Sequence, residues 1–287
     1  MQKYIAENIN SHYYSRLAGF AAGMEHHYKK SSIHQFRVDI KKLRAFYRLL
    51  SLQTGEAQAL KLPRKLKKMY RDLGKIRDLQ QHKESIASWS RKIGIDAPGH
   101  LLAQLKHQLK KQSAKKRVVL PEKYFLRQAE KTNQQLPEQF SMETLQSFFR
   151  QKKEAIRVII ERGRFEDDEL HTIRKSIKDM LYVSAIYTDD LKSALPLLFL
   201  QAGETEKMDI LAQDIGKYND AGNSLAWLQR STTGYTGRDK KKILLYYKTR
   251  VQEKKALRKK IIPALHFFVL PPAPENHAQP ATANAPQ

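Results

Sequence analysis

The chain has 287 residues, 41% of them hydrophobic, so it is long enough to form one large domain or two small ones around a packed core. Its 53 Lys and Arg against 29 Asp and Glu give a formal net charge of +24, which indicates an acidic partner such as nucleic acid, anionic lipid or polyphosphate. The absence of cysteine excludes disulfides, thiolate metal sites and cysteine nucleophiles.

Helical periodicity extends through almost the whole chain, and Ala, Leu, Lys, Gln and Glu, which favour helices, dominate the periodic segments. Breaks such as Thr54-Gly55 and Ala97-Pro98-Gly99 separate these segments. The pattern predicts an all-α fold with helices over 3–28, 32–52, 60–91, 99–117, 141–161, 167–188, 205–230 and 237–262.

The lack of long apolar segments predicts a soluble protein. No apolar signal sequence follows Met1, and no apolar run approaches the roughly 20 residues that cross a bilayer. We therefore expect a cytoplasmic protein with no membrane partner. Residues 271–287 are rich in Pro and Ala and contain no Lys or Arg, which predicts a disordered tail.

Two motifs occur twice, in the same order. His34-x-x-Arg37-x-x-x-Lys41 recurs as His171-x-x-Arg174-x-x-x-Lys178, and the segment Asp72–Asp78 recurs as Asp214–Asp220. Two matched pairs in register indicate an internal duplication. We expect one domain over about residues 1–270, in which two copies of one helical unit, at about 1–137 and 138–265, pack together.

Basic residues form a stripe on the first motif's helix. His34, Arg37, Lys41, Arg44 and Arg48 fall within about 80° on a helical wheel and extend over roughly 21 Å. A separate face carries Phe36, Ile40, Leu43, Tyr47 and Leu50. The +3/+4 spacing of the stripe is one that apolar residues usually occupy in helix–helix seams, so its cations predict a surface that faces an anionic ligand.

The next predicted helix carries a second stripe, formed by Arg64, Lys67, Lys68, Arg71 and Lys75. Such a run also fits a solvated helix face. The duplication adds His171, Arg174, Lys178 and Lys217 as candidate ligand contacts in the second copy.

Several residues in these motifs have more than one interpretation. His34 and His171 fit either phosphate contacts or helix-cap and core positions. Asp78 and Asp220 fit catalytic carboxylates, but ion pairs with neighbouring arginines are the favoured interpretation. Gly74 and Gly216 predict close packing or a kink, because glycine is a poor helix former.

The sequence contains no phosphate-binding loop, HExxH zinc pair or GxSxG elbow. We therefore expect a non-catalytic protein with no metal and no cofactor. The second copy is also poorer in cations than the first. Leu181 and Ala185 stand at the places of Arg44 and Arg48, and Glu206, Asp209, Ile210 and Gln213 stand at the places of Arg64, Lys67, Lys68 and Arg71. The first copy is expected to contribute more to anion binding.

The duplicated motifs resemble those of the conserved-histidine α-helical domain (CHAD) family. The resemblance rests on His34-x-x-Arg37-Val38-x-x-Lys41-Lys42-Leu43-Arg44, on Leu73–Asp78, and on their second copies. It implies two pseudo-symmetric helical bundles with a basic cleft or channel between them. It also implies that the protein binds inorganic polyphosphate and associates with polyphosphate granules. The implied contacts are His34, Arg37, Lys41, Arg44, His171, Arg174 and Lys178. Leu181 departs from the family pattern, in which an arginine usually precedes the tyrosine.

Nucleic acid is the alternative partner, because its phosphate backbone attracts the same basic surface. The stripes contain no interleaved aromatic residues on which bases could stack. This difference favours polyphosphate over single-stranded nucleic acid.

Overall fold

The computed structural model describes residues 2–24, 28–54, 59–114, 119–190, 202–231 and 236–266. Within these ranges the chain forms nine α-helices and no strand, which confirms the predicted all-α fold. The helices are α1 (Lys3–Ala22), α2 (Lys30–Thr54), α3 (Arg64–Lys92), α4 (Gly99–Ala114), α5 (Glu122–Asn133), α6 (Met142–Glu161), α7 (Asp167–Asp190), α8 (Ala202–Ser231) and α9 (Gly237–Leu265).

The sequence prediction omits α5, whose twelve residues bury only Phe125 and Ala129. The helix is short, and its few apolar residues stand among charged and polar ones, so the segment resembles a connection between longer helices. The first predicted helix is also too long, because α1 ends at Ala22 with Gly23 as its C-cap. The other predicted helices match α2–α4 and α6–α9 within a few residues.

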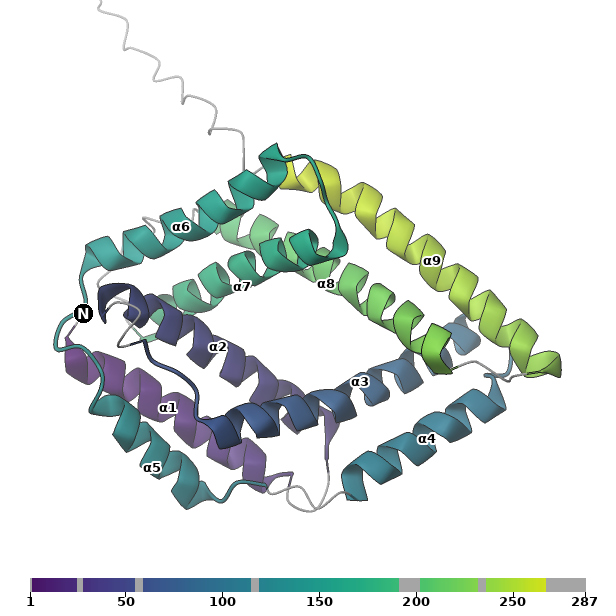
Figure 1. Ribbon diagram of the computed structural model, residues 1–287, viewed down its shortest axis with the longest axis horizontal. Helices are drawn as coiled ribbons and strands as arrows, with labels where there is room; N and C mark the ends of the chain where they lie inside the picture. Colours follow the sequence, from purple (N-terminus) through teal and green to yellow (C-terminus); the bar gives the residue numbers. More distant parts are fainter. Residues whose placement is uncertain are drawn as a thin grey trace, which may run out of the picture.

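Helix α2 occupies the centre of the arrangement and contacts α1, α3, α6 and α7 (Figure 1). Helix α5 packs on α1, and α8 packs on both α7 and α9. Helix α9 forms one outer edge of the molecule, alongside α8 (Figure 1). The two helices that carry the repeated His–Arg–Lys motif, α2 and α7, therefore lie in direct contact.

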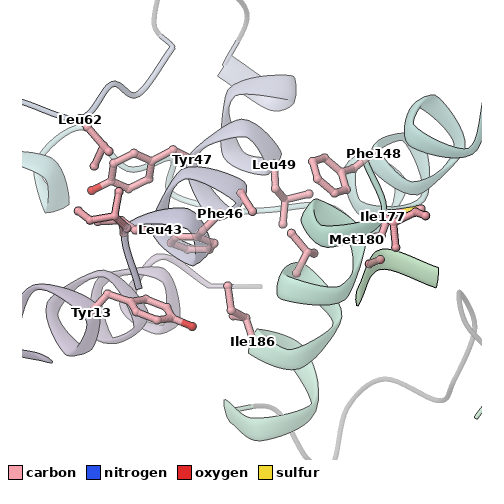
Figure 2. Close-up of a cluster of buried hydrophobic side chains, with 14 of the residues drawn as sticks. Tyr13, Leu43, Phe46, Tyr47, Leu49, Leu62, Phe148, Ile177, Met180 and Ile186 are labelled. Carbon is pink, nitrogen blue, oxygen red and sulfur yellow. The ribbon is translucent and has the colours of Figure 1, made fainter. Parts of the chain in front are cut away.

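The main hydrophobic core joins these central helices (Figure 2). Leu43, Phe46 and Leu49 of α2 are fully buried. Phe148 of α6 and Met180 of α7 are at most 1% exposed. Burial of large apolar side chains stabilises a fold by about 1.5–3 kcal/mol each. The contact between α2 and α7 is thus held by apolar side chains that both helices bury in this core.

A second, smaller core joins the far ends of α3 and α8 to α4 and α9. It contains Trp89 of α3, Leu105 of α4, Trp227 of α8 and Tyr246 of α9. The Tyr246 hydroxyl lies 2.7 Å from the Ser85 Oγ of α3. Helices α3 and α8 are therefore connected at both ends, by the α2–α7 contact and by this second core.

The two bundles, their pseudo-symmetry and the repeat boundaries near residues 137 and 265 stay predictions. The predicted disordered tail, 271–287, lies outside the described residues. No helix in the described ranges is long and apolar enough to cross a membrane.

The fold makes a prediction about two adjacent residues of α2. Leu43 is fully buried, whereas its neighbour Arg44 is exposed. Leu43→Ala is expected to lower the free energy of unfolding by about 2–5 kcal/mol, because it leaves a cavity in the core. Arg44→Ala is expected to change it by less than about 0.5 kcal/mol. Urea unfolding followed by circular dichroism measures both, and equal losses would show that the buried face of α2 is assigned wrongly.

Candidate functional site

The first basic stripe on α2 contacts two neighbouring helices, α3 through Arg37 and α7 through Arg48. His34, Arg44 and Arg48 are exposed, while Arg37 and Lys41 are partly buried. The stripe is therefore not a uniformly solvated surface. Arg37 and Arg48 bind groups of neighbouring helices, the Tyr70 carbonyl of α3 and the Asp179 carboxyl of α7.

Arg37 lies across α3. Its Nη1 donates a hydrogen bond to the backbone carbonyl of Tyr70 at 2.9 Å, and its guanidinium carbon lies 4.4 Å from the centre of the Tyr70 ring. A Cβ atom at Gly74 would lie 2.4 Å from Nη1. Glycine at this position gives the guanidinium the room to lie against the helix.

The second copy repeats this contact. Arg174 Nε of α7 donates to the backbone carbonyl of Ala212 at 3.1 Å. A Cβ atom at Gly216 would lie 3.1 Å from that Nε. The close packing predicted for the two glycines is confirmed, and its partner in each case is the motif arginine.

Lys41 lies where the two motifs meet. The pKa of Lys41 is lowered to about 8. Burial is the largest cause, and the positive charges of Arg174, Arg37 and Lys178 contribute to the lowering. The Asp220 carboxylate acts in the opposite direction. Lys41 has no ion-pair partner within the described part of the chain. A partly buried ammonium thus stands among three cations that come from both copies of the motif.

The corresponding lysine of the second copy is neutralised. Lys178 Nζ lies 2.7 Å from Asp209 Oδ1, and the hydrogen bond from Lys178 lowers the pKa of that carboxyl. Asp209 stands at the place that Lys67 occupies in the first copy. The excess positive charge is therefore concentrated at Lys41.

Several residues of the predicted stripes have carboxylate partners. Arg48 Nη1 donates to both oxygens of the buried Asp179, at 2.7 and 2.8 Å, and Lys152 lies 3.0 Å from the same carboxyl. This cluster links α2, α6 and α7, so Arg48 has a structural contact that its place in the stripe does not reveal. Weaker pairs join Lys68 and Lys75 to Asp72, at 3.3 and 4.0 Å, and Lys217 to Asp214, at 3.7 Å.

The remaining members of the second stripe are Arg64, Lys67 and Arg71, which are exposed. The ion pairs found in the described ranges include none of them, nor Arg44. They line a cavity of about 950 Å³ between α2, α3 and α6. The structure thus brings part of the second stripe together with the end of the first.

The two motif histidines are exposed, so they are not core residues. Partial desolvation lowers the pKa of both, with nearby cations adding to the effect: Arg77 and Lys41 at His34, and Lys175 and Arg174 at His171. His171 Nδ1 lies 3.2 Å from Asn219 Nδ2. The lowered pKa favours the neutral form of both rings, which can still donate a hydrogen bond to an anion from one nitrogen.

Asp78 and Asp220 line a second cavity, of about 970 Å³, at the C-terminal parts of α3 and α8. Desolvation raises the pKa of both carboxyls, although Arg37 and Arg77 oppose this at Asp78, and Arg174 and Arg250 at Asp220. The ion pairs predicted for these carboxylates are absent from the structure described. Arg37 is bonded instead to the Tyr70 carbonyl, so the prediction about these aspartates was wrong.

Sequence reasoning missed two arginines of this cavity, Arg77 and Arg250. Arg77 stands inside the repeated motif, so its place there was an available signal, whereas nothing in the periodicity of α9 distinguishes Arg250. Among the residues that the structure describes, neither Arg77 Nη1 nor Arg250 Nε has a hydrogen-bond partner, although both atoms are buried. Within the described ranges, no group of three or more His, Asp or Glu side chains is placed to hold a metal ion.

The protein is thus all-helical in its described residues, and the Arg and Lys residues of its two repeated motifs lie near one another around Lys41. The family profile described as "CHAD domain" matches residues 11–229, and the chain belongs to this family. The crystal structure of the CHAD domain from the plant Ricinus communis has the same fold, with a TM-score of 0.69 and 15% sequence identity. The match covers 93% of this chain and 92% of the plant domain. No curated protein sequence matches the chain.

The contact between Gly74 and Arg37 predicts that a single methyl group will impair anion binding. Gly74→Ala places a carbon in the space of the guanidinium and displaces it from the Tyr70 carbonyl, so affinity for long-chain polyphosphate is expected to fall by about tenfold. Helix stability is not expected to fall, because alanine favours a helix by about 1 kcal/mol over glycine.

The matched control is Gly19→Ala in α1, where no atom lies within 4 Å of the new methyl group. This variant is expected to bind polyphosphate as the unmodified protein does. If Gly74→Ala also binds normally, the position of Arg37 against α3 does not matter for ligand binding.

Proposed function

We propose that this protein is a non-catalytic binding protein for inorganic polyphosphate. The observation that carries the proposal is the environment of Lys41, where cations of both motifs gather around a partly buried ammonium. Such a centre is incomplete without negative charge, because like charges in a desolvated site repel one another strongly. A polyanion that enters the site supplies the missing charge.

The shape and chemistry of the basic residues fit a long polyphosphate chain. The stripe on α2 spans roughly 21 Å, and polyphosphate carries about one negative charge per phosphate along its length. Arg37 and Arg174 can form paired hydrogen bonds with phosphate oxygens, and Lys41 adds a compact charge. His34 and His171 can each add at least one donor.

Membership of the CHAD family supports this ligand class, because the family pattern implies binding of inorganic polyphosphate. The same implication supports an association with polyphosphate granules, which we propose as the location of the protein in the cell.

The arrangement of aromatic residues favours polyphosphate over nucleic acid. Trp89 and Trp227 are at most 9% exposed and belong to the second core. The Tyr70 ring is covered on one face by Arg37. Proteins that bind single-stranded nucleic acid usually stack its bases on exposed aromatic rings.

The proposal predicts the outcome of a competition experiment. Unlabelled long-chain polyphosphate should displace a fluorescent polyphosphate at a lower phosphate concentration than either single- or double-stranded DNA. Affinity should also fall steeply as salt is added, since binding releases counterions. More effective displacement by DNA would make the protein a nucleic-acid-binding protein.

A variant and an activity measurement complete this test. Arg37→Ala combined with Lys41→Ala should weaken polyphosphate binding by at least tenfold and reduce its dependence on salt. Long incubation with polyphosphate should release no orthophosphate. Steady release that the double variant abolishes would show that the site is catalytic.

A further inference from the structure

The cavity between α2, α3 and α6 has a composition that inorganic polyphosphate does not explain. The residues that line it include eight Lys or Arg and no Asp or Glu. They also include an apolar group, formed by Ile40, Tyr47, Leu52, Leu60, Leu62 and Phe148. Polyphosphate can use the cations but has no apolar part to place against these side chains.

A short segment builds the apolar wall. Residues 59–63 pass along α2 before Pro63 caps α3. The backbone N–H of Leu60 donates to the Ser51 Oγ at 3.1 Å, and that hydroxyl donates to the Tyr47 carbonyl at 2.7 Å. Figure 2 shows Tyr47 and Leu62 side by side, with Phe148 farther away, beyond Leu49. The wall is thus fastened to the helix that carries the first stripe.

Five of the eight cations are free to meet a ligand. Arg48 and Lys152 are bound to Asp179, and Lys68 is paired with Asp72. Among the ion pairs of the described residues, none includes Arg44, Lys61, Arg64, Lys67 or Arg71, and all five side chains belong to exposed residues. Three of the five are arginines, whose planar guanidinium groups bind phosphate in pairs of hydrogen bonds and stack on planar rings.

We propose that this cavity binds a nucleoside triphosphate, with the phosphates on the five cations and the nucleoside against the apolar wall. A volume of about 950 Å³ is large enough for such a ligand, and small-molecule sites commonly combine an apolar lining with a few charged groups. This site is distinct from the one proposed for polyphosphate, because Lys41 does not line this cavity. The second copy cannot form an equivalent site, because Leu181, Asp209 and Gln213 replace Arg44, Lys67 and Arg71.

Calorimetric titration of the full chain with ATP and with inorganic tripolyphosphate tests the proposal. Both ligands contain three linked phosphates, so they differ chiefly in the adenosine group. ATP is expected to bind about tenfold more tightly or better, although it carries less negative charge. Tripolyphosphate binding as tightly as ATP would overturn the proposal, and tighter binding of dodecyl phosphate than of ATP would assign the apolar wall to an acyl chain instead.

Variants separate the two parts of the ligand. Leu52 is 38% exposed, so Leu52→Ser should leave the fold intact, lower ATP affinity and leave tripolyphosphate affinity unchanged. Arg64→Ala with Arg71→Ala should lower the affinity for both ligands by at least tenfold. Removal of two exposed cations from α4, by Lys106→Ala with Lys110→Ala, is the matched control and should lower neither by more than twofold.

A last comparison separates this proposal from the proposed function. Arg37→Ala with Lys41→Ala should weaken long-chain polyphosphate binding and leave ATP affinity within twofold of the unmodified protein. Equal losses for both ligands would mean that one shared site binds both and would overturn the separate nucleotide site. Failure of polyphosphate binding alone, with ATP binding intact, would count against the proposed function only.

Discussion

The repulsion among Lys41, Arg37, Arg174 and Lys178 is the constraint on which the rest of the structure depends. Burial of Lys41 beside these cations opposes folding, although Asp209 neutralises Lys178, and the lowered pKa of Lys41 reflects first its burial and then the neighbouring charges. The apolar contact between α2 and α7 holds them there, through residues such as Ile40 and Ile177 that are fully buried. Burial of the apolar core thereby stabilises a fold that keeps these cations close together, and an anion that binds there can neutralise them.

The neighbouring helices determine which cations stay unpaired and where they lie. Gly74 and Gly216 let the motif arginines lie against α3 and α8, so their guanidinium groups are held by backbone carbonyls and not by carboxylates. Carboxylates do neutralise cations nearby, as Asp209 does for Lys178 and Asp179 for Arg48. The free charge is therefore concentrated on the α2 and α3 side, first at Lys41 and then in the cavity lined by Arg44, Arg64, Lys67 and Arg71.

Periodicity and repetition predict much of this arrangement. The apolar spacing of α2 identifies the face that Leu43 buries, and the repeated motif identifies Arg37 and Arg174 as equivalent. Contacts between residues far apart in sequence leave no such pattern. Asp179 follows its partner Arg48 by 131 positions, and Asp209 is paired with Lys178 from a different helix. Such pairs depend on which helices meet, which helical spacing does not encode. Helix α5 was missed because it is short and mostly polar.

The most direct test is an NMR measurement of the Lys41 side chain, in protein labelled at the lysine Cε and assigned by its absence from the Lys41→Arg variant. The account predicts that Lys41 titrates at about pH 8 in the free protein. Saturation with long-chain polyphosphate should raise this pKa by more than one unit, since a bound anion favours the charged ammonium. An ordinary lysine pKa near 10.4 in the free protein, or a pKa that polyphosphate leaves unchanged, would contradict the claim that the ligand supplies the missing charge.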